Sequence, residues 1–375
     1  MSVDPERGIL VVPLTSPATD YYGGDRKGAN LFGDSVLALD AATGKRLWHF
    51  QTIHHDLWDW DLPAQPNLVA VRRDGRDVPA VAQVTKTGFL FLLDRLTGKP
   101  LIEVEERAVP QSVVPGERTW PTQPFPVRPP PFARQTMTLD ELTDVTPESR
   151  AECLKLIEGA VTGPMFRPIG FDFTVMFPGT NGGANWGGAS YDAASGLLFV
   201  NSMDVASMFR TVERPPGSKL PYRVSSRSGG NSRFWDSKLN PCQKPPWGHL
   251  TAIDLNKGEH QWMTPIGDGP RDHPLLKGLN LPPLGERMQM VTVLVTRTLL
   301  FVGATPVGTD DRARVSTTPP VIYAFDKSGK PLRAIDIDAF SAAAPMTYMH
   351  GGKQYIVVAT GRGPNSELVA LSLPN

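Results

Sequence analysis

The segment HHDLWDWDLPAQP, residues 54–66, gathers side chains whose types could do chemistry. Two histidines, three aspartates and two tryptophans occupy its first eight positions. Their spacing fits neither the i, i+4 histidine pair of a zinc protease helix nor a calcium-loop pattern. The residue types permit acid–base or metal chemistry, so the elements around the segment must decide whether it is an active-site segment or an aromatic, charged loop.

The composition describes a globular chain with no electrostatic preference for polyanions. Its 375 residues are 40% hydrophobic, enough for the core of one large domain or two ordinary ones. Lysine plus arginine equals aspartate plus glutamate at 38 each, so nucleic acid is not an expected partner. The apolar segments are shorter than the roughly 20 residues that span a bilayer, so no membrane span is expected in this chain. No signal peptide is visible at the start, which by itself indicates cytoplasm.

The numbers of glycine, proline and cysteine residues limit the possible fold classes. The 35 glycines and 37 prolines favour short strands and many turns over long helices. The two cysteines, Cys153 and Cys242, are too few for a zinc site and too far apart for a redox CxxC motif. Free thiols in the core are the default expectation for them, and a disulfide is the alternative.

One hairpin plan recurs four times along the chain. In each copy an apolar strand ends in Asp, a small turn reaches Gly, and a second strand begins. The copies are SVLALDAATGKRLWHF (35–50), FLFLLDRLTGKPLIEV (89–104), HLTAIDLNKGEHQWMT (249–264) and PVIYAFDKSGKPLRAI (320–335). Side-chain caps on the turns are expected from Asp40, Asp94, Asp254 and Asp326, and positive φ from Gly44, Gly98, Gly258 and Gly329. A second hairpin type precedes the first at residues 1–13 and 189–202, which suggests four strands per unit.

Four-stranded units that recur at about 40 to 50 residues are typical of a β-propeller. The sequence therefore predicts an all-β fold in which residues 1–375 form a single partial propeller domain of four-stranded antiparallel blades. The pattern supplies four blades and part of a fifth, because residues 344–373 end without a complete set of partner strands. Trp48 and Trp262, at the ends of their hairpins, are expected to pack between blades.

A Pro-rich and short-helical insertion interrupts the repeat at about residues 109–168. Its first part is expected to be extended or irregular because of its prolines. In its second part, Thr138 with Glu141 predicts a capping box, and Thr146 followed by Pro147 predicts a helix start. The insertion is interpreted as a covering loop and not as a separate domain.

With the blades placed, the motifs resemble a known family. The motifs are LALDAATGKRLWHFQTIHHDLWDWDLPAQP, TKTGFLFLLDRLTGKP, PTQPF, NWGGASYDAASGLLFVNS, PPWGHLTAIDL and APMTYMHGGKQYIVV. In this order they are similar to those of quinoprotein dehydrogenases of the membrane-bound glucose dehydrogenase type, and they cover nearly the whole chain. Members of that family are eight-bladed propellers that bind pyrroloquinoline quinone (PQQ) near the axis. The resemblance implies that this chain is an incomplete eight-bladed quinoprotein propeller.

The resemblance implies roles for four residues. Asp59, in LWD, corresponds to the catalytic base, and Lys86, in the TKTG turn, to a lysine that hydrogen-bonds the quinone oxygens. Asn201, at the end of the GLLFVN strand, and Trp186, in NWGG, correspond to positions beside the cofactor. Such a base takes the substrate's hydroxyl proton as hydride leaves carbon, and a fixed ammonium stabilises negative charge that develops on the quinone. The resemblance also implies Ca²⁺ or Mg²⁺, for which the sequence identifies no ligands.

The function implied by the resemblance is oxidation of a sugar or alcohol hydroxyl by hydride transfer to PQQ. Electrons would pass to a quinone or cytochrome acceptor, and the location would be the periplasm. Two alternatives stay open. One is a non-catalytic propeller that serves as a binding scaffold or is an inactive fragment, and the other is a metal-dependent hydrolase that uses the cluster of His54, His55 and the neighbouring aspartates. For these two histidines, packing and hydrogen bonding around the Asp59 loop is the expected role.

The chain departs from the family pattern at both ends. Met1 falls inside what resembles a mid-chain hairpin, which indicates a fragment or a misplaced start. Near the C-terminus, Pro319 and Tyr323 stand where the family has an Asp followed by an Arg-Ala-aromatic stretch. The stretch ATGRGPNSEL replaces a Gly-rich segment that contains histidine. These positions bear on substrate specificity and on the quinone pocket, so the sequence does not identify the sugar or alcohol.

Overall fold

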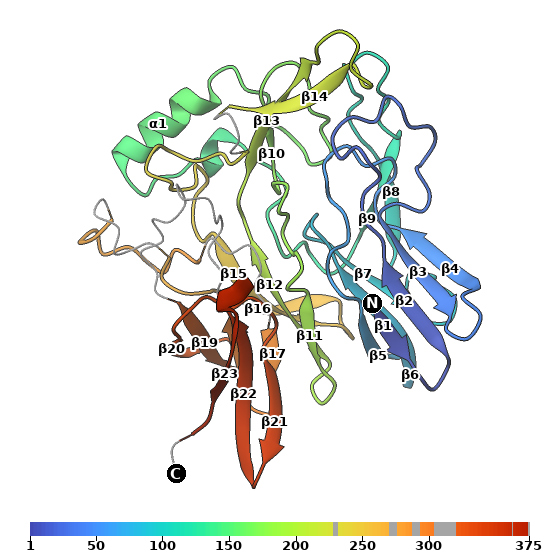
Figure 1. Ribbon diagram of the computed structural model, residues 1–375, viewed down its shortest axis with the longest axis vertical. Helices are drawn as coiled ribbons and strands as arrows, with labels where there is room; N and C mark the ends of the chain where they lie inside the picture. The colour runs from blue at the N-terminus through green and yellow to red at the C-terminus, as the bar shows by residue number, and fades with distance from the viewer. Residues whose placement is uncertain (228–231, 270–275, 287–292, 304–319, 362, 374–375) are drawn as a thin grey trace. The chain divides into compact units, whose positions relative to one another are not determined.

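The computed structural model describes residues 1–227, 232–269, 276–286, 293–303, 320–361 and 363–373 (Figure 1). Pro319 and Arg362, which belong to the two divergent C-terminal stretches, lie outside these residues. The chain divides into two compact units, which are described separately. The first comprises Met1–Gly183 and Asp204–Pro245, and the second Ala184–Met203 and Pro246–Asn375.

The first unit is built from antiparallel sheets whose order follows the chain. A four-stranded sheet runs β1 (Ser2–Asp4), β2 (Ile9–Pro13), β3 (Ser35–Asp40) and β4 (Arg46–Gln51). A three-stranded sheet holds β5 (Asn67–Arg73), β6 (Arg76–Val84) and β7 (Leu90–Asp94), and a two-stranded sheet holds β8 (Val104–Ala108) and β9 (Thr122–Pro126). A further three-stranded sheet has the order β10 (Thr174–Met176), β13 (Ser207–Glu213) and β14 (Tyr222–Ser226). The core of the first unit includes Val11, Val36, Trp58, Trp60, Phe91 and Phe166, all nearly inaccessible to solvent.

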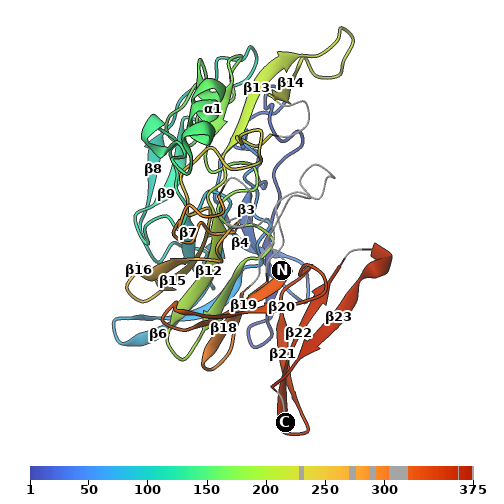
Figure 2. The ribbon, with the colours of Figure 1, turned by 90° about the vertical axis from the view of Figure 1, so that its left-hand side faces the viewer.

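The second unit repeats the same construction. One four-stranded sheet runs β11 (Ala189–Asp192), β12 (Leu197–Met203), β15 (Gly248–Asp254) and β16 (Glu259–Pro265). Another runs β17 (Val293–Val295), β18 (Leu299–Gly303), β19 (Val321–Asp326) and β20 (Pro331–Asp336). The last sheet holds β21 (Met346–His350), β22 (Lys353–Thr360) and β23 (Glu367–Leu371), whose strands run alongside one another in Figure 2. The prediction of an all-β chain is confirmed, while the number of blades stays a prediction.

The aspartate-capped turns form as the sequence predicts. Asp40 Oδ1 accepts hydrogen bonds of 2.7–3.1 Å from the N–H groups of Ala42 and Thr43 and from the Thr43 hydroxyl. Asp94 Oδ1 accepts the same set from the two residues at the equivalent positions of its turn. The turns of Asp254 and Asp326 are capped in the same manner. The glycines that complete the turns have φ values of 70° (Gly44), 71° (Gly98), 68° (Gly258) and 85° (Gly329).

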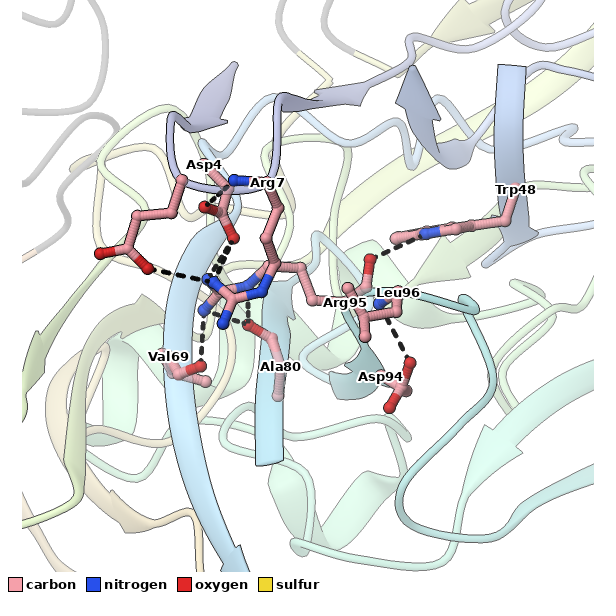
Figure 3. A network of polar contacts seen from close by, with 9 residues as sticks. Asp4, Arg7, Trp48, Val69, Ala80, Asp94, Arg95 and Leu96 are labelled. Carbon is pink, nitrogen blue, oxygen red and sulfur yellow. Dashed lines mark hydrogen bonds and ion pairs between the residues drawn. The ribbon is translucent and has the colours of Figure 1, made fainter. Parts of the chain in front are cut away.

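A buried indole joins one hairpin to the next. Trp48 on β4 donates from Nε1 to the Arg95 carbonyl oxygen at 2.9 Å (Figure 3), and a Cβ on Gly98 would lie 2.5 Å from its ring. Glycine is therefore needed at this turn both for its positive φ and for the close approach of the ring. Trp262 on β16 makes the same contact with the Lys327 carbonyl oxygen, at 3.0 Å. The predicted packing of these tryptophans between successive hairpins is confirmed.

Arg95 extends this contact into a polar network that Figure 3 shows. Its guanidinium donates to the carbonyl oxygens of Val69 and Ala80 and pairs with Asp4 at 2.8 Å. Asp4, which is 3% exposed, also pairs with Arg7 at 3.1 Å. The network ties the hairpin of β1 and β2 to the sheet of β5 to β7, so the sheet that precedes the 54–61 loop is held against the sheet that precedes Lys86.

The insertion at residues 109–168 contains one helix, α1 (Pro147–Ile157), and one short 3-10 turn, η1 (Leu139–Glu141). The helix starts where the sequence predicts, with Thr146 Oγ1 accepting from the Ser149 N–H at 3.0 Å. The predicted capping box at Thr138 is wrong, because the Thr138 side chain makes no capping bond and Glu141 pairs instead with Arg134 at 2.8 Å. Among the described residues, no helix has the length and apolar character needed to cross a bilayer.

Cys153 and Cys242 form a disulfide, so the default expectation of free thiols is wrong. Both residues are fully buried, and their Cα atoms lie 5.5 Å apart, within the usual range for a disulfide. They are 89 positions apart in the sequence, so their approach depends on how α1 packs and not on any local pattern.

Removing this disulfide is expected to lower the free energy of unfolding by about 2–5 kcal/mol, because the closed loop is long and the unfolded chain gains its freedom. The double variant C153S/C242S avoids leaving a lone buried thiol. Its melting temperature, measured without reductant, should fall below that of the wild type and should not respond to added reductant. The wild type under reductant should approach the same value. An unchanged wild-type melting temperature under full reduction would contradict a stabilising role.

Candidate active site

The loop at residues 54–61 follows β4 and is held by a buried carboxylate. Asp56, which is fully buried, accepts from the Trp58 N–H through Oδ1 at 2.9 Å and from the Trp60 N–H through Oδ2 at 3.0 Å. Asp59 lies between these two tryptophans with a φ of 60°. This left-handed conformation is one that aspartate adopts more readily than most residues. The Asp56 side chain therefore fixes the backbone on both sides of Asp59.

The two tryptophans anchor the same loop in the core. Their rings stack with centroids 5.5 Å apart, and both rings form T-shaped contacts with Phe166. The indole N–H of Trp58 donates to the Arg167 carbonyl oxygen at 2.8 Å, and that of Trp60 to the Gly179 carbonyl oxygen at 3.1 Å. The alternation of Trp and Asp in LWDWD thus places the rings in the core while Asp59 keeps a partly exposed carboxylate.

Lys86 contacts this loop from the turn that follows β6. Its Nζ donates to the Asp59 carbonyl oxygen at 2.7 Å and forms ion pairs with Asp59 Oδ1 at 3.4 Å and Asp61 Oδ1 at 2.6 Å. Only 6% of Lys86 is exposed, and a Cβ on Gly182 would lie 2.4 Å from its Cβ, so the backbone packs directly on the lysine. The structure therefore brings together Asp59 and Lys86, which are 27 positions apart.

The surroundings shift the titration of both groups. Burial raises the pKa of Asp59 to about 7; the Lys86 ammonium lowers it, but the carboxylates of Asp56, Asp61 and Asp20 raise it further. Burial lowers the pKa of Lys86, but the attraction of Asp59 and Asp61 outweighs it, so the net shift is upward and the ammonium stays protonated. At neutral pH the site thus holds a carboxyl group that can take or give a proton beside a permanent cation.

The hydroxyl of Tyr21 is a third group that contacts Asp59, the candidate base. This hydroxyl donates to Asp59 Oδ2 over a long 3.4 Å. Burial, together with neighbouring carboxylates, raises the pKa of the phenol, so it stays a donor at neutral pH. No sequence pattern points to Tyr21, which is 38 positions from Asp59. Asp61 did carry a signal, because it shares the 54–66 segment and lies two positions from Asp59.

Asn201 and Trp186 belong to the second unit. Asn201 lies on β12, and its Oδ1 is buried and has no hydrogen-bond partner in the described part of the chain. Trp186 follows Asn185 in a turn, and its indole is 58% exposed. An unpaired amide oxygen and an exposed flat ring are features that a bound planar cofactor or a hard cation could satisfy. The Lys86 ammonium, which is paired with Asp59 and Asp61, is the cation of this loop that an anionic oxygen of PQQ could contact.

His54 and His55 are held by hydrogen bonds around the loop, as expected. His54 Nδ1 lies 2.7 Å from Gln51 Oε1 and its Nε2 lies 3.1 Å from Glu106 Oε1. His55, which is 4% exposed, contacts the Gly28 carbonyl oxygen through Nδ1 at 2.7 Å. The residues that the structure describes contain no group of three or more His, Cys, Asp or Glu arranged to hold a metal ion.

Tyr323, one of the divergent C-terminal residues, lies on β19 in the second unit. Its hydroxyl donates to Glu286 Oε1 at 2.9 Å on the wall of a cavity of about 440 Å³. Both residues are largely withdrawn from solvent, and burial with the Glu286 charge raises the pKa of the phenol. The divergence therefore places a polar pair on a cavity wall.

Successive hairpins linked by indole–carbonyl contacts, with a carboxylate and an ammonium in direct contact, are features of a repeat protein of the propeller class. The chain belongs to the PQQ family described as glucose/ethanol/alcohol dehydrogenase, beta-propeller domain, whose model matches residues 1–356. The resemblance seen in the sequence motifs is thereby confirmed at the level of the family.

Individual relatives agree with this assignment. The chain is 34% identical to the quinate/shikimate dehydrogenase (quinone) of Acinetobacter baylyi, over 96% of this chain and 46% of the relative. It is 32% identical to the quinoprotein glucose dehydrogenase of Gluconobacter oxydans, over 100% of this chain and 49% of the relative. The chain thus spans about half the length of the curated relatives it matches.

A solved structure shares the fold. The quinohemoprotein alcohol dehydrogenase from Comamonas testosteroni superposes with a TM-score of 0.58 at 21% identity, covering 96% of this chain and 44% of that one. This likeness concerns the propeller-type fold of the chain.

Proposed function

We propose that this chain serves in a PQQ-dependent dehydrogenase that oxidises a hydroxyl group of a sugar or alcohol. The observation that carries the proposal is the buried contact between Lys86 and Asp59, in which the carboxyl pKa is raised to about 7. A general base is most effective when its pKa lies near the working pH. Membership of the PQQ family supplies the cofactor.

In the proposed mechanism, Asp59 takes the proton of the substrate hydroxyl as the carbon loses hydride. PQQ, when bound, supplies the hydride acceptor. Lys86 would hold an anionic oxygen of the bound cofactor and offset the negative charge that develops on it. Asp61 keeps the ammonium in position through their 2.6 Å ion pair. Tyr21 orients the second oxygen of Asp59. The Trp58–Trp60 stack excludes water from the inner side of the loop.

We propose, as the family resemblance implies, that Asn201 and Trp186 contribute contacts to the cofactor. The exposed indole of Trp186 offers an apolar face on which a flat ring can stack. The unpaired Oδ1 of Asn201 can accept a hydrogen bond from the cofactor or bind the Ca²⁺ or Mg²⁺ that we expect with it. On the fold, we propose that residues 1–375 form a single partial domain of an eight-bladed propeller with the insertion at 109–168. Three four-stranded sheets among the described residues, each with its strands in chain order, support this proposal.

The proposed location is the periplasm, with a quinone or cytochrome as electron acceptor. The Cys153–Cys242 disulfide supports an oxidising compartment, since such bonds are rare in the cytosol. The relative from Acinetobacter baylyi carries quinone in its name, which supports a quinone acceptor.

The proposal is tested by adding PQQ and Ca²⁺ to the apo-protein. Saturable quenching of tryptophan fluorescence is expected, followed by reduction of a dye acceptor on addition of glucose, quinate or glycerol. Mg²⁺ in place of Ca²⁺ and a chelator in place of either cation serve as controls. Failure to bind PQQ under any of these conditions would favour the alternative, a non-catalytic scaffold or inactive fragment.

A further inference from the structure

Three side chains behind the Asp59 loop form a buried polar chain that the proposed mechanism does not use. Ser16 Oγ lies 3.1 Å from Asp34 Oδ1 and 2.5 Å from Asp56 Oδ2. Asp34 is 1% exposed and Asp56 is 0% exposed, while Ser16 is half-buried. One hydroxyl therefore bridges two carboxyl groups that are both withdrawn from water.

The number of protons shared by Asp34, Ser16 and Asp56 follows from how many hydrogen bonds each group can donate. A serine hydroxyl donates one hydrogen bond, and an ionised carboxylate only accepts. Ser16 cannot donate to both aspartates at once, so hydrogen bonds at both the 2.5 Å and the 3.1 Å contact require a second proton on one of the carboxyl groups. In that arrangement the protonated carboxyl donates to Ser16 Oγ, and Ser16 donates to the ionised carboxylate.

The remaining hydrogen bonds decide which aspartate carries the proton. Asp56 accepts from Ser16 and from the N–H groups of Trp58 and Trp60, which suits a charged carboxylate. Asp34 Oδ2 is buried and has no hydrogen-bond partner among the described residues. Leaving a charged oxygen buried and unpaired is costly, whereas a neutral carboxyl bears this at much lower cost.

The titration of the two groups agrees with this assignment. Burial raises the pKa of Asp34 well above its ordinary value, and the Asp56 and Asp61 carboxylates add to the rise against the opposing effects of Ser16 and Arg26. Burial also raises the pKa of Asp56, but the hydrogen bonds from Ser16, Trp58 and Trp60 and the charge of Lys86 act against it. The stronger rise at Asp34 agrees with placing the proton on that residue.

We propose that Asp34 is a protonated carboxylic acid that donates to Ser16, and that this chain of hydrogen bonds keeps Asp56 ionised so that Asp56 positions Asp59. Asp34 and Asp56 are thus positioning residues. The effect on catalysis rests on the proposed function, whereas the protonation of Asp34 does not. Because Asp56 is one of the charges that raise the pKa of Asp59, it also contributes to the basicity of that residue.

Infrared spectroscopy of the apo-protein tests the protonation directly. At a pH of about 8.5, where Asp59 is mostly ionised given its pKa of about 7, the wild type is expected to retain a carboxylic acid C=O band that shifts in D₂O. The band should vanish in D34N and remain in D59N. Burial also raises the pKa of Glu117, so E117Q is the matched control and should keep the Asp34 band. A spectrum without the band, or a band that survives in D34N, would overturn the proposal.

The pH dependence of stability gives a second readout that needs no cofactor. A carboxyl whose pKa is raised on folding contributes stability that is present below its unfolded pKa and is lost as pH rises towards the folded value. Asparagine is neutral throughout, so the melting temperature of D34N relative to wild type should climb as pH rises from about 4, the ordinary pKa of aspartate. A difference that is constant or shrinks with pH would contradict a protonated Asp34.

The catalytic consequence is read from D56N in the PQQ-loaded protein. Loss of the Asp56 charge is expected to move the acid limb of the kcat/KM profile to lower pH, which a purely structural defect would not do. An unmoved limb with reduced kcat would refute the link to Asp59. If PQQ does not bind but the infrared band is present, the proposed function fails while the protonation of Asp34 stands.

Discussion

The variant D59N is expected to lose about 10²- to 10⁴-fold in kcat, the contribution typical of a positioned general base. Asparagine has nearly the shape of aspartate but cannot take up the substrate proton. Lys86 would still contact the carbonyl oxygen of residue 59 and the carboxylate of Asp61, so the lysine should stay in place. Affinity for PQQ, followed by tryptophan fluorescence, should therefore change far less than turnover measured with a dye acceptor.

The dependence of kcat/KM on pH gives a second test of Asp59 as the base. The base must be ionised to act, so wild-type kcat/KM should rise with pH through a limb near 7, the value to which burial raises the pKa of Asp59. Residual activity of D59N should lack that limb. Asp77, whose side chain is 69% exposed, offers the matched control D77N, which should keep both turnover and limb. Substantial turnover in D59N with an intact acid limb would assign the base to another residue.

The variant K86M is expected to lose about 10²- to 10³-fold in kcat, comparable to the removal of one electrostatic stabiliser from an active site. Methionine keeps much of the apolar length of lysine but removes the ammonium, which leaves Asp59 and Asp61 without their shared cation. The pKa of Asp59 should then rise above its present value, since the Lys86 charge is what lowers it. The acid limb should therefore move to higher pH, opposite in direction to the shift expected for D56N.

The same substitution should weaken PQQ binding, because the anionic cofactor loses a buried cation. Turnover, the position of the acid limb and PQQ affinity are measured together, with the melting temperature checked at each pH. K86R is the informative companion: it keeps the charge, but the backbone of Gly182 lies against the lysine, so the bulkier guanidinium should restore the limb position only in part. A K86M protein with wild-type PQQ affinity and an unmoved acid limb would show that Lys86 has no role in the proposed site.

The local parts of this molecule could be predicted from its sequence. The capped turns at Asp40 and Asp94 depend on residues within three or four positions, so their pattern is visible in the chain itself. The contact of Asp59 with Lys86 was implied only by the resemblance of LWD and TKTG to a known family. Spacing alone gave no reason for the two to meet.

The parts that escaped prediction depend on contacts between distant segments. The Cys153–Cys242 bond spans 89 positions and the Tyr21–Asp59 contact 38. Asp34 follows a glycine in an unremarkable loop, and its role emerges only once Ser16 and Asp56 are seen on the same hydroxyl. The capping box at Thr138 failed for a local reason, since Glu141 pairs with Arg134, seven positions earlier in the chain.

The indole contacts between hairpins bear on how this chain tolerates length variation. Trp48 reaches the turn of Arg95 across 47 positions, and Trp262 reaches that of Lys327 across 65, yet the two contacts have the same donor, the same kind of acceptor and nearly the same distance. The chain between such fixed points can lengthen without disturbing their alignment. Loops of very different length, including those that carry Asp59 and Lys86, can thus vary on this scaffold. The spacing between its hairpins is set by a tryptophan ring that packs against a turn glycine.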